Sequence, residues 1–175
     1  MRLFIAAELP DNMLDALAET SADLRSNVHG RYVRPDMFHV TLAFLGEVEA
    51  SRISIIESII ERVCARHTPI ATSLGELGSF GKKGNAILWQ GIAGNTLALA
   101  DLADDIRDEL ESEGFAFDEK PFRAHITLMR KANLIEASLA APHKAAGAID
   151  TITLFHSRRV DERLVYEPLY RTILR

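Results

Sequence analysis

The sequence contains very little cysteine and no long hydrophobic run. Cys64 is the only cysteine among 175 residues, so neither an intrachain disulfide nor a multi-cysteine metal site can form. The apolar runs stop well short of the roughly 20 residues that a membrane helix requires, and the opening apolar stretch is too short for a signal peptide. These absences favour a cytoplasmic protein in a reducing setting and argue against a membrane protein or an exported precursor.

Basic residues are fewer than acidic ones. The chain has 20 Lys and Arg against 25 Asp and Glu, which gives a formal net charge of −5 at pH 7. That balance excludes the extended basic surface of a protein that coats nucleic acid. Any nucleic-acid partner must therefore be bound locally, by a few basic residues in a pocket. Because 47% of the residues are hydrophobic, the chain has enough apolar side chains to bury a core.

No Pro-rich, Ser-rich or low-complexity segment divides the chain, so we expect a single domain over residues 1–175. Helical spacing of apolar positions predicts three helices and a shorter fourth that Pro142 breaks. Asn95 or Thr96 is placed to cap the third helix and Gly114 to end it. The expected helices occupy residues 11–28, 53–67, the segment between Asn95 and Gly114, and residues within 134–146.

Short runs of β-branched and apolar residues predict strands between these helices. Strands interleaved with helices indicate an α/β or α+β fold. Several connections between strands are too short for crossover helices, which favours antiparallel or mixed sheets over a doubly wound parallel one. The expected strands occupy residues 3–7, 38–45, 70–77, 86–92, 122–129, 148–156 and 165–174.

The sequence repeats one tetrapeptide almost unchanged. His39-Val40-Thr41-Leu42 is followed 86 residues later by His125-Ile126-Thr127-Leu128. With six His and nine Thr in the chain, roughly 0.3 His-x-Thr triplets are expected by chance. Two occur, each with a β-branched residue inside and a leucine after it, so the pair is a more specific signal than either copy alone.

Both copies lie in runs that favour a strand. In a strand, residues i and i+2 point to the same face. We therefore expect His39 and Thr41 to project together, and His125 and Thr127 likewise, while the residues between them face a core. The sequence thus predicts two pairs of imidazole and hydroxyl groups, one in each half of a pseudo-symmetric fold.

Two such pairs suit in-line displacement at phosphorus. The attacking and leaving oxygens lie on opposite sides of the phosphorus, so one group must accept a proton and another must supply one. An imidazole with an ordinary pKa of about 6.5 can act as base or acid near neutral pH. The threonine hydroxyls can donate hydrogen bonds to the non-bridging oxygens, and no metal is then required.

Other interpretations of these residues remain open. A histidine on a strand is also commonly a hydrogen-bonded structural residue. Two histidines on separate strands are compatible with a zinc site, although no acidic or cysteine ligand lies at motif spacing near either one. Cys64 falls on the apolar face of a predicted helix and is interpreted as a core residue rather than a nucleophile. The remaining histidines are expected on the surface or in loops: His29, His67, His143 and His156.

Beyond the paired motifs, several segments carry a family resemblance. The sequence resembles the RNA 2',3'-cyclic phosphodiesterases, also called 2'-5' RNA ligases, of the two-histidine phosphoesterase superfamily. The resemblance covers essentially the whole chain, and the paired His-x-Thr motifs are its defining signature. The matching segments are residues 1–6, Glu8-Leu9-Pro10, 38–48, Leu88-Trp89, 121–128 with Arg130, and Tyr166-Glu167-Pro168-Leu169.

The resemblance implies a bilobal, pseudo-two-fold α+β fold, in which each lobe has an antiparallel or mixed sheet with helices outside and both motifs face a central cleft. It implies hydrolysis of a 2',3'-cyclic phosphate on RNA or oligonucleotide ends, or on cyclic nucleotides, to a 2'-phosphate. It assigns His125 as general base on water and His39 as general acid on the departing 3' oxygen, with Thr41 and Thr127 completing the two half-sites. It implies no metal, cofactor or membrane, and a monomer suffices.

Arginines near the second motif are candidates for contact with the phosphate. Strand parity places Arg123 on the histidine's face and Arg130 on the opposite face unless the strand twists or ends there. The family motif, which often ends in Leu-Ala-Arg, favours Arg130 instead, so both are kept as candidates. Arg158 and Arg159 follow a late strand and either line the cleft or are solvated.

Two further functions remain open. By microscopic reversibility, the same site can join a cyclic-phosphate end to a 5'-hydroxyl through a 2'-5' linkage. A non-catalytic module that binds nucleotides or RNA ends is the alternative from another class. The two intact motifs argue against it, because binding alone does not require an acid and a base on opposite sides of a phosphorus.

Overall fold

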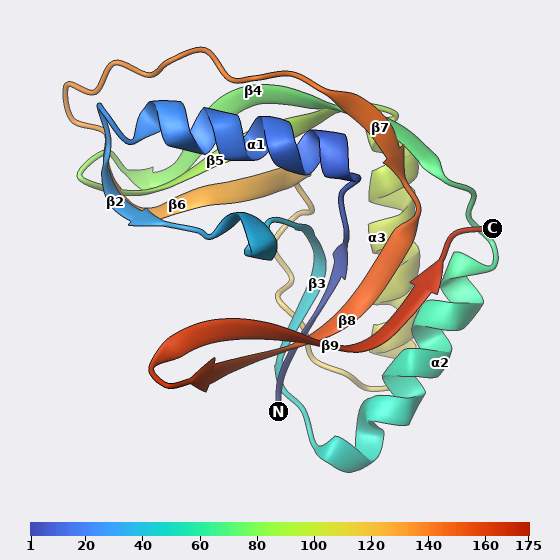
Figure 1. Ribbon diagram of the computed structural model, residues 1–175. Helices are drawn as coiled ribbons and strands as arrows, with labels where there is room; N and C mark the ends of the chain where they lie inside the picture. The colour runs from blue at the N-terminus through green and yellow to red at the C-terminus, as the bar shows by residue number, and fades with distance from the viewer.

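The computed structural model describes residues 1–175, which form two curved antiparallel sheets and three α-helices (Figure 1). Two short 3-10 helices, η1 (Pro35–Met37) and η2 (Ala50–Arg52), lie in connections. The helices are α1 (Asp11–Leu24), α2 (Ile53–Cys64) and α3 (Thr96–Ser112). The strands are β1 (Arg2–Ala7), β2 (His29–Tyr32), β3 (Val40–Glu47), β4 (Ile70–Lys82), β5 (Asn85–Gly94), β6 (His125–Asn133), β7 (Ala146–Ile149), β8 (Thr151–Val160) and β9 (Arg163–Ile173).

The two sheets divide the His-x-Thr motifs between them. The first sheet has the strand order β3-β1-β8-β9, and the second has the order β2-β6-β5-β4-β7. Every strand pair in both sheets is antiparallel. The first motif leads into β3 and the second starts β6, so each sheet supplies one histidine. The expected bilobal α+β architecture is confirmed.

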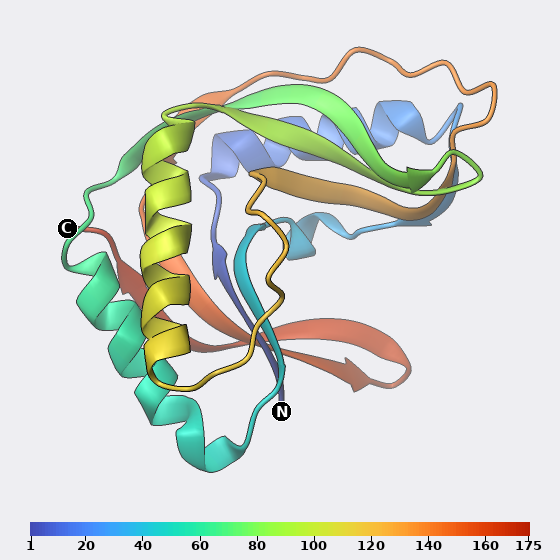
Figure 2. The ribbon, with the colours of Figure 1, turned by 180° about the vertical axis from the view of Figure 1, so that it is seen from behind.

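The helices cover the outer sides of the sheets. Figure 1 shows α1 running across the second sheet, and Figure 2 shows α2 and α3 side by side at the edge of the first. Helix α3 contacts β3, and α2 contacts β8 and β9. Beneath the helices, 39 buried hydrophobic side chains form one cluster that includes residues of both sheets and all three helices. The expectation of a single domain over residues 1–175 stays a prediction.

Local signals at the ends of α3 behave as the sequence predicts. The Asn95 side chain accepts a hydrogen bond from the Ala98 amide at 3.2 Å and caps the first turn. Gly114 follows the helix with a φ of +72°, a left-handed conformation that glycine adopts without steric cost.

Other expectations about local structure are wrong. The segment 134–145 contains no helix; instead the His143 amide donates to the Thr20 hydroxyl of α1, and the His143 carbonyl accepts from Gln90 of β5. The single strand expected at 148–156 is two strands, because the chain passes from the second sheet to the first at Asp150. Strand β2 was not expected, since its side chains are mostly exposed and show no apolar alternation.

The two motif strands also begin later than expected. Strand β3 starts at Val40 and β6 at His125, rather than at residues 38 and 122. No helix in the structure combines the length and the apolar composition needed to cross a membrane.

Candidate functional site

Each His-x-Thr motif is followed by a β-bulge at its leucine. Along β3, the partners of consecutive β1 residues are Thr41 and Ala43, which leaves the leucine between them as the extra residue. Along β6, the partners of consecutive β5 residues are Thr127 and Met129, with the same result. One extra residue reverses the inward and outward alternation of the rest of a strand. The third residue after each threonine therefore returns to the threonine's face.

This bulge corrects the parity argument for Arg130. In an unbroken strand Arg130 would lie opposite His125, but Leu128 and Met129 are both buried and Arg130 is exposed on the motif face. Arg123 lies in the irregular segment just before β6, so strand parity does not apply to it. Both arginines nevertheless lie at the site, because each one lines a cavity next to a motif histidine.

Two of the cavities that border the motifs share a wall. One has a volume of about 470 Å³ and is lined by His39, Thr41 and Arg130, among others. The second has a volume of about 690 Å³ and is lined by His125, Arg123 and again Thr41. Because Thr41 lines both cavities, the half-sites from the two sheets meet there.

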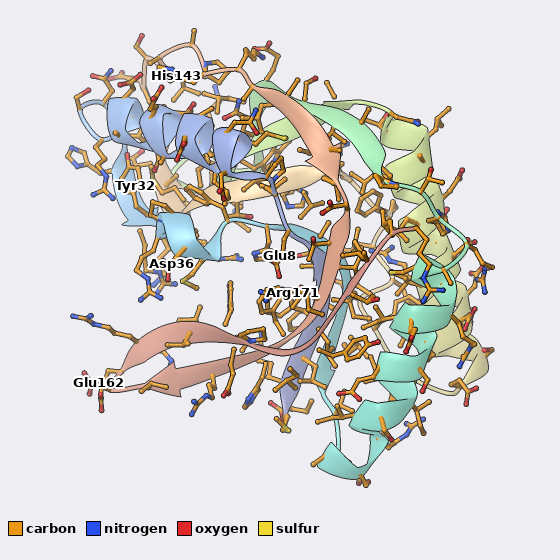
Figure 3. All side chains as sticks on the ribbon, turned by 45° about the vertical axis from the view of Figure 1, so that its right-hand side comes forward. Glu8, Tyr32, Asp36, His143, Glu162 and Arg171 are labelled. Carbon is orange, nitrogen blue, oxygen red and sulfur yellow. The ribbon has the colours of Figure 1, made fainter.

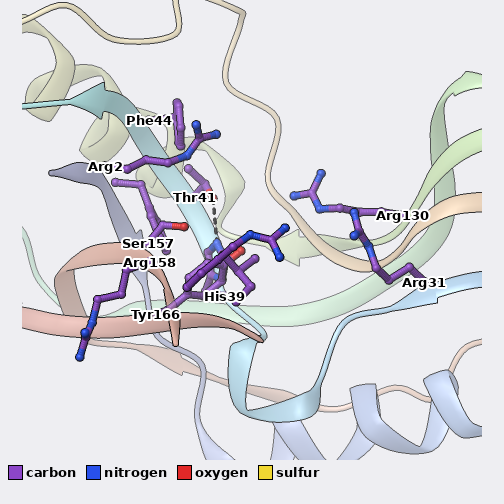
Figure 4. A pocket seen from close by; sticks show the side chains of 12 residues that line it. Arg2, Arg31, His39, Thr41, Phe44, Arg130, Ser157, Arg158 and Tyr166 are labelled. Carbon is purple, nitrogen blue, oxygen red and sulfur yellow. Dashed lines mark hydrogen bonds between the residues drawn. The ribbon is translucent and has the colours of Figure 1, made fainter. Parts of the chain in front are cut away.

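The hydrogen bonds of His39 fix its tautomer. Nδ1 lies 2.7 Å from the Met37 carbonyl oxygen, and Nε2 lies 2.9 Å from the Thr41 hydroxyl, the bond drawn in Figure 4. A carbonyl oxygen only accepts, so Nδ1 carries the hydrogen and the neutral ring presents an Nε2 lone pair, which accepts from Thr41. Phe4 and Tyr166 enclose the ring, with centroids 5.0 and 5.4 Å away.

His125 is held in the same way. Its Nδ1 donates to the Arg123 carbonyl oxygen at 2.6 Å, which leaves Nε2 of the neutral ring unprotonated. Phe80 and Trp89 pack beside the ring, with centroids 5.1 and 5.9 Å away. Thr127 lies two residues further along β6, half-buried, and the structure records a hydrogen bond between motif histidine and threonine only in the first motif.

Burial and neighbouring positive charge lower the pKa values of both histidines. Burial lowers the pKa of His39 to about 4; the hydrogen bond to Met37 opposes this, and Arg130 and His125 add to it. The pKa of His125 is also lowered, mainly by burial and further by Arg123 and Arg130, against its own bond to a carbonyl. Both Nε2 atoms are therefore unprotonated at neutral pH, and an anion placed between the arginines would favour protonation.

Several residues that line the first cavity were not among the site residues predicted from the sequence. Figure 4 shows Arg2, Arg31 and Tyr166 around His39. Tyr166 lies within a segment that carried the family resemblance, which was the one signal available for it. Arg2 lies in another such segment, residues 1–6, whereas Arg31 has no such signal, because it comes from β2, whose side chains show no apolar alternation. Arg158 and Arg159 line this cavity too.

The structure contains no group of three or more His, Cys, Asp or Glu side chains positioned to hold a metal ion. The zinc alternative therefore has no set of protein ligands at the two histidines. Cys64 is buried and its pKa is raised to about 12 by burial, so its thiol is unsuited to act as a nucleophile.

Known proteins are similar to this chain in sequence and in fold. An RNA 2',3'-cyclic phosphodiesterase of Escherichia coli (strain K12) is 30% identical over 175 residues, which cover 99% of this chain and 96% of that protein. One of Geobacillus stearothermophilus is 35% identical over 130 residues, 73% of this chain, and the match spans only 41% of that relative's length.

Solved structures agree with these sequence matches. A Thermus thermophilus protein superimposes with a TM-score of 0.86 at 26% identity, over 99% of this chain and 98% of that one. Escherichia coli LigT in complex with 3'-AMP gives a TM-score of 0.81 at 28% identity, over 99% and 97% of the two chains. The sequence profile of the 2'-5' RNA ligase superfamily matches residues 13–161. With the profile spanning most of the chain and the fold shared over its full length, this protein belongs to the 2'-5' RNA ligase superfamily.

Proposed function

We propose that this protein hydrolyses the terminal 2',3'-cyclic phosphate of RNA to a 2'-phosphate. The observation that carries the proposal is the matched state of the two histidines. Each has its Nδ1 hydrogen held by a backbone carbonyl, and each presents an unprotonated Nε2 beside a cavity that is lined by an arginine. The names of the relatives in Escherichia coli and Geobacillus stearothermophilus support the same reaction.

In this reaction the two imidazoles take opposite roles. His125 Nε2 accepts a proton from water as the water oxygen bonds to phosphorus, and the bond from phosphorus to O3' breaks. His39, protonated in the bound complex, donates its Nε2 proton to O3', and the 2'-phosphate remains. Proton exchange with solvent then restores the resting state, and each acid or base role is typically worth about 10²- to 10⁴-fold in rate.

Substrate binding itself supplies the conditions for this division of roles. Burial is the main cause of the lowered pKa values of the two histidines, Arg130 adds to it at both and Arg123 at His125, and a bound phosphate anion offsets the charge of these arginines. Once His39 is protonated, its Nε2 donates rather than accepts, so the Thr41 hydroxyl can turn its hydrogen toward a non-bridging phosphate oxygen. We propose the same role for Thr127 in the second motif.

The superfamily's name also indicates the ligation direction. A 5'-hydroxyl of a second RNA would take the place of water beside His125, and the products would be joined through a 2'-5' linkage. The cavity of about 690 Å³ on the His125 side is within the usual size range of a small-molecule site and leaves room for such an acceptor. Since both half-sites come from one chain, we propose that the protein acts as a monomer, in the cytoplasm.

Incubation with an oligonucleotide that ends in a 2',3'-cyclic phosphate tests the function. We expect a 2'-phosphate product, loss of turnover by about 10²-fold or more in His39→Ala and His125→Ala, and normal turnover in the control His29→Ala, which changes an exposed histidine of β2. A 3'-phosphate product would contradict the assigned leaving group. Binding without any product would support the non-catalytic module instead.

A further inference from the structure

Another cavity adjoins the one at His39 and is lined by neither motif histidine. It has a volume of about 400 Å³ and shares Arg31, Arg130 and Arg159 with the cavity at His39. One wall comes from β2 and the segment after it, and the other from the β8–β9 hairpin. Figure 3 shows the hairpin tip, marked by Glu162, projecting on the same side of the molecule as Tyr32 and Asp36.

Five arginines line this adjoining cavity, which we call the arginine groove: Arg31, Arg34, Arg130, Arg159 and Arg163. Arg34 pairs with Asp36 at 3.1 Å, but the other four have no carboxylate partner. Glu162 is the only acidic residue among those that line the groove. In a chain with a net charge of −5, four unpaired guanidinium groups in one groove repel one another unless an anion lies between them.

The two walls of the groove are joined across the sheets. Arg34 Nη2 donates to the Leu164 carbonyl of β9 at 3.3 Å, which links the segment after β2 to the hairpin. Apolar surface accompanies the charge, because Tyr32, Leu164 and Tyr166 also line the groove. Guanidinium groups bind phosphate oxygens in a bidentate manner, and flat aromatic rings receive bases or riboses. The groove therefore suits a single-stranded nucleic acid rather than an isolated anion.

We propose that the arginine groove binds the sugar–phosphate backbone of the nucleotides on the 5' side of the terminal cyclic phosphate. The inference rests on the proposed function. His39 donates to O3', so the terminal ribose lies in the cavity on the His39 side. The only chain connection from that ribose is its 5'-phosphate, and the cavity there leads directly into the groove. The preferred substrate is accordingly an oligonucleotide and not a cyclic mononucleotide.

The test compares two substrates with the same reacting end. One is 2',3'-cyclic AMP, and the other is an adenylate trinucleotide that ends in a 2',3'-cyclic phosphate. The variant is Arg163→Gln, which removes an arginine that lines the groove but not the cavity at His39; the residue is exposed, so the fold should tolerate the change. The matched control is Arg66→Gln, an exposed arginine that pairs with Glu109 and lines none of these cavities.

We expect the wild type and Arg66→Gln to favour the trinucleotide in kcat/KM. In Arg163→Gln the ratio of the kcat/KM values for the trinucleotide and the mononucleotide should fall by about fivefold. The logarithmic salt dependence of trinucleotide binding should become shallower by about 0.7 for each lost phosphate contact. An unchanged ratio and salt slope, with both substrates still hydrolysed, would overturn the groove proposal alone. Absence of hydrolysis of either substrate by the wild type would overturn the proposed function.

Discussion

Two backbone carbonyls decide which nitrogen of each motif histidine is available for chemistry. The carbonyls of Met37 and Arg123 take the Nδ1 hydrogens of His39 and His125, so both rings present Nε2. Each carbonyl belongs to the residue two positions before its histidine. A local contact of this kind is fixed by the backbone just before the strand begins, and it needs no partner from elsewhere in the fold.

The lowered pKa of His39 makes the stability of the protein depend on pH. The folded-state pKa of about 4 lies below the unfolded value near 6.5, so the folded state binds fewer protons between these values. The stabilising contribution is complete above pH 6.5 and is lost as the pH falls toward 4. In urea unfolding at pH 7.5 and 4.5, we expect the wild type to lose about 2 kcal/mol more than His39→Asn.

The control for this measurement is His29→Asn, which should behave like the wild type because His29 is exposed. An equal loss of stability in the wild type and in His39→Asn would contradict the buried, neutral state of His39.

The sequence predicted the four motif residues and the two arginines near the second motif, but not the other residues that surround them. His39 and Thr41 could be paired because a strand relates residues i and i+2 by simple alternation. Arg31 and Tyr166 reach the same cavity from β2 and β9, which lie in different sheets. Only the tertiary fold brings them together, and no spacing in the sequence encodes it.

At the level of elements, the two β-bulges decide which side chains lie on the motif face, and the positions of the strands alone do not. Strand alternation predicted the wrong face for Arg130, because one extra residue after Thr127 shifts the pattern. Bulges leave little trace in a sequence of apolar residues, since Leu128 and Met129 are both suitable for a core. By contrast, helices α2 and α3 were predictable because many positions repeat the same 3.6-residue signal.

The close contact between the paired strands β4 and β5 gives a test of how the second sheet positions His125. Gly78 pairs with Trp89, and a Cβ atom built on Gly78 would lie 2.2 Å from the Trp89 ring. Gly78→Ala should therefore displace the indole beside His125, at a cost of about 1–3 kcal/mol in stability. We expect kcat/KM to fall between about ten- and a hundredfold, with a change in the fluorescence of Trp89, the only tryptophan.

Gly84→Ala is the matched control, because its added Cβ would meet only the end of the Ile135 side chain at 3.4 Å. If Gly78→Ala kept full activity and an unaltered emission spectrum, Trp89 would not be the support for His125 that the packing indicates.

At the scale of the whole molecule, the two sheets are interleaved along the chain. The first sheet takes β1, β3, β8 and β9, and the second takes β2 and β4 to β7. Neither sheet is a contiguous stretch of sequence, because the chain passes from one sheet to the other four times. The two halves that the repeated motif suggested are the two sheets, each built from separate parts of the sequence. The sequence pattern alone could not distinguish this arrangement from two successive segments.

This interleaving predicts a single cooperative unfolding transition. Trp89 fluorescence reports on the second sheet, and far-ultraviolet circular dichroism includes the helices that pack on the first. The two signals should give the same midpoint and the same slope in urea. Two separate transitions would show that the lobes unfold independently and would contradict a single domain over residues 1–175.

The arginines beside the histidines also bear on how the reaction ends. A cyclic phosphodiester carries one negative charge, whereas a phosphomonoester carries about 1.5 to 2 at neutral pH. Arg123 and Arg130 therefore attract the product more strongly than the substrate. An active site that attracts anions in this way binds its product more tightly than its substrate. We therefore expect release of the 2'-phosphate, rather than bond cleavage, to limit the rate of turnover.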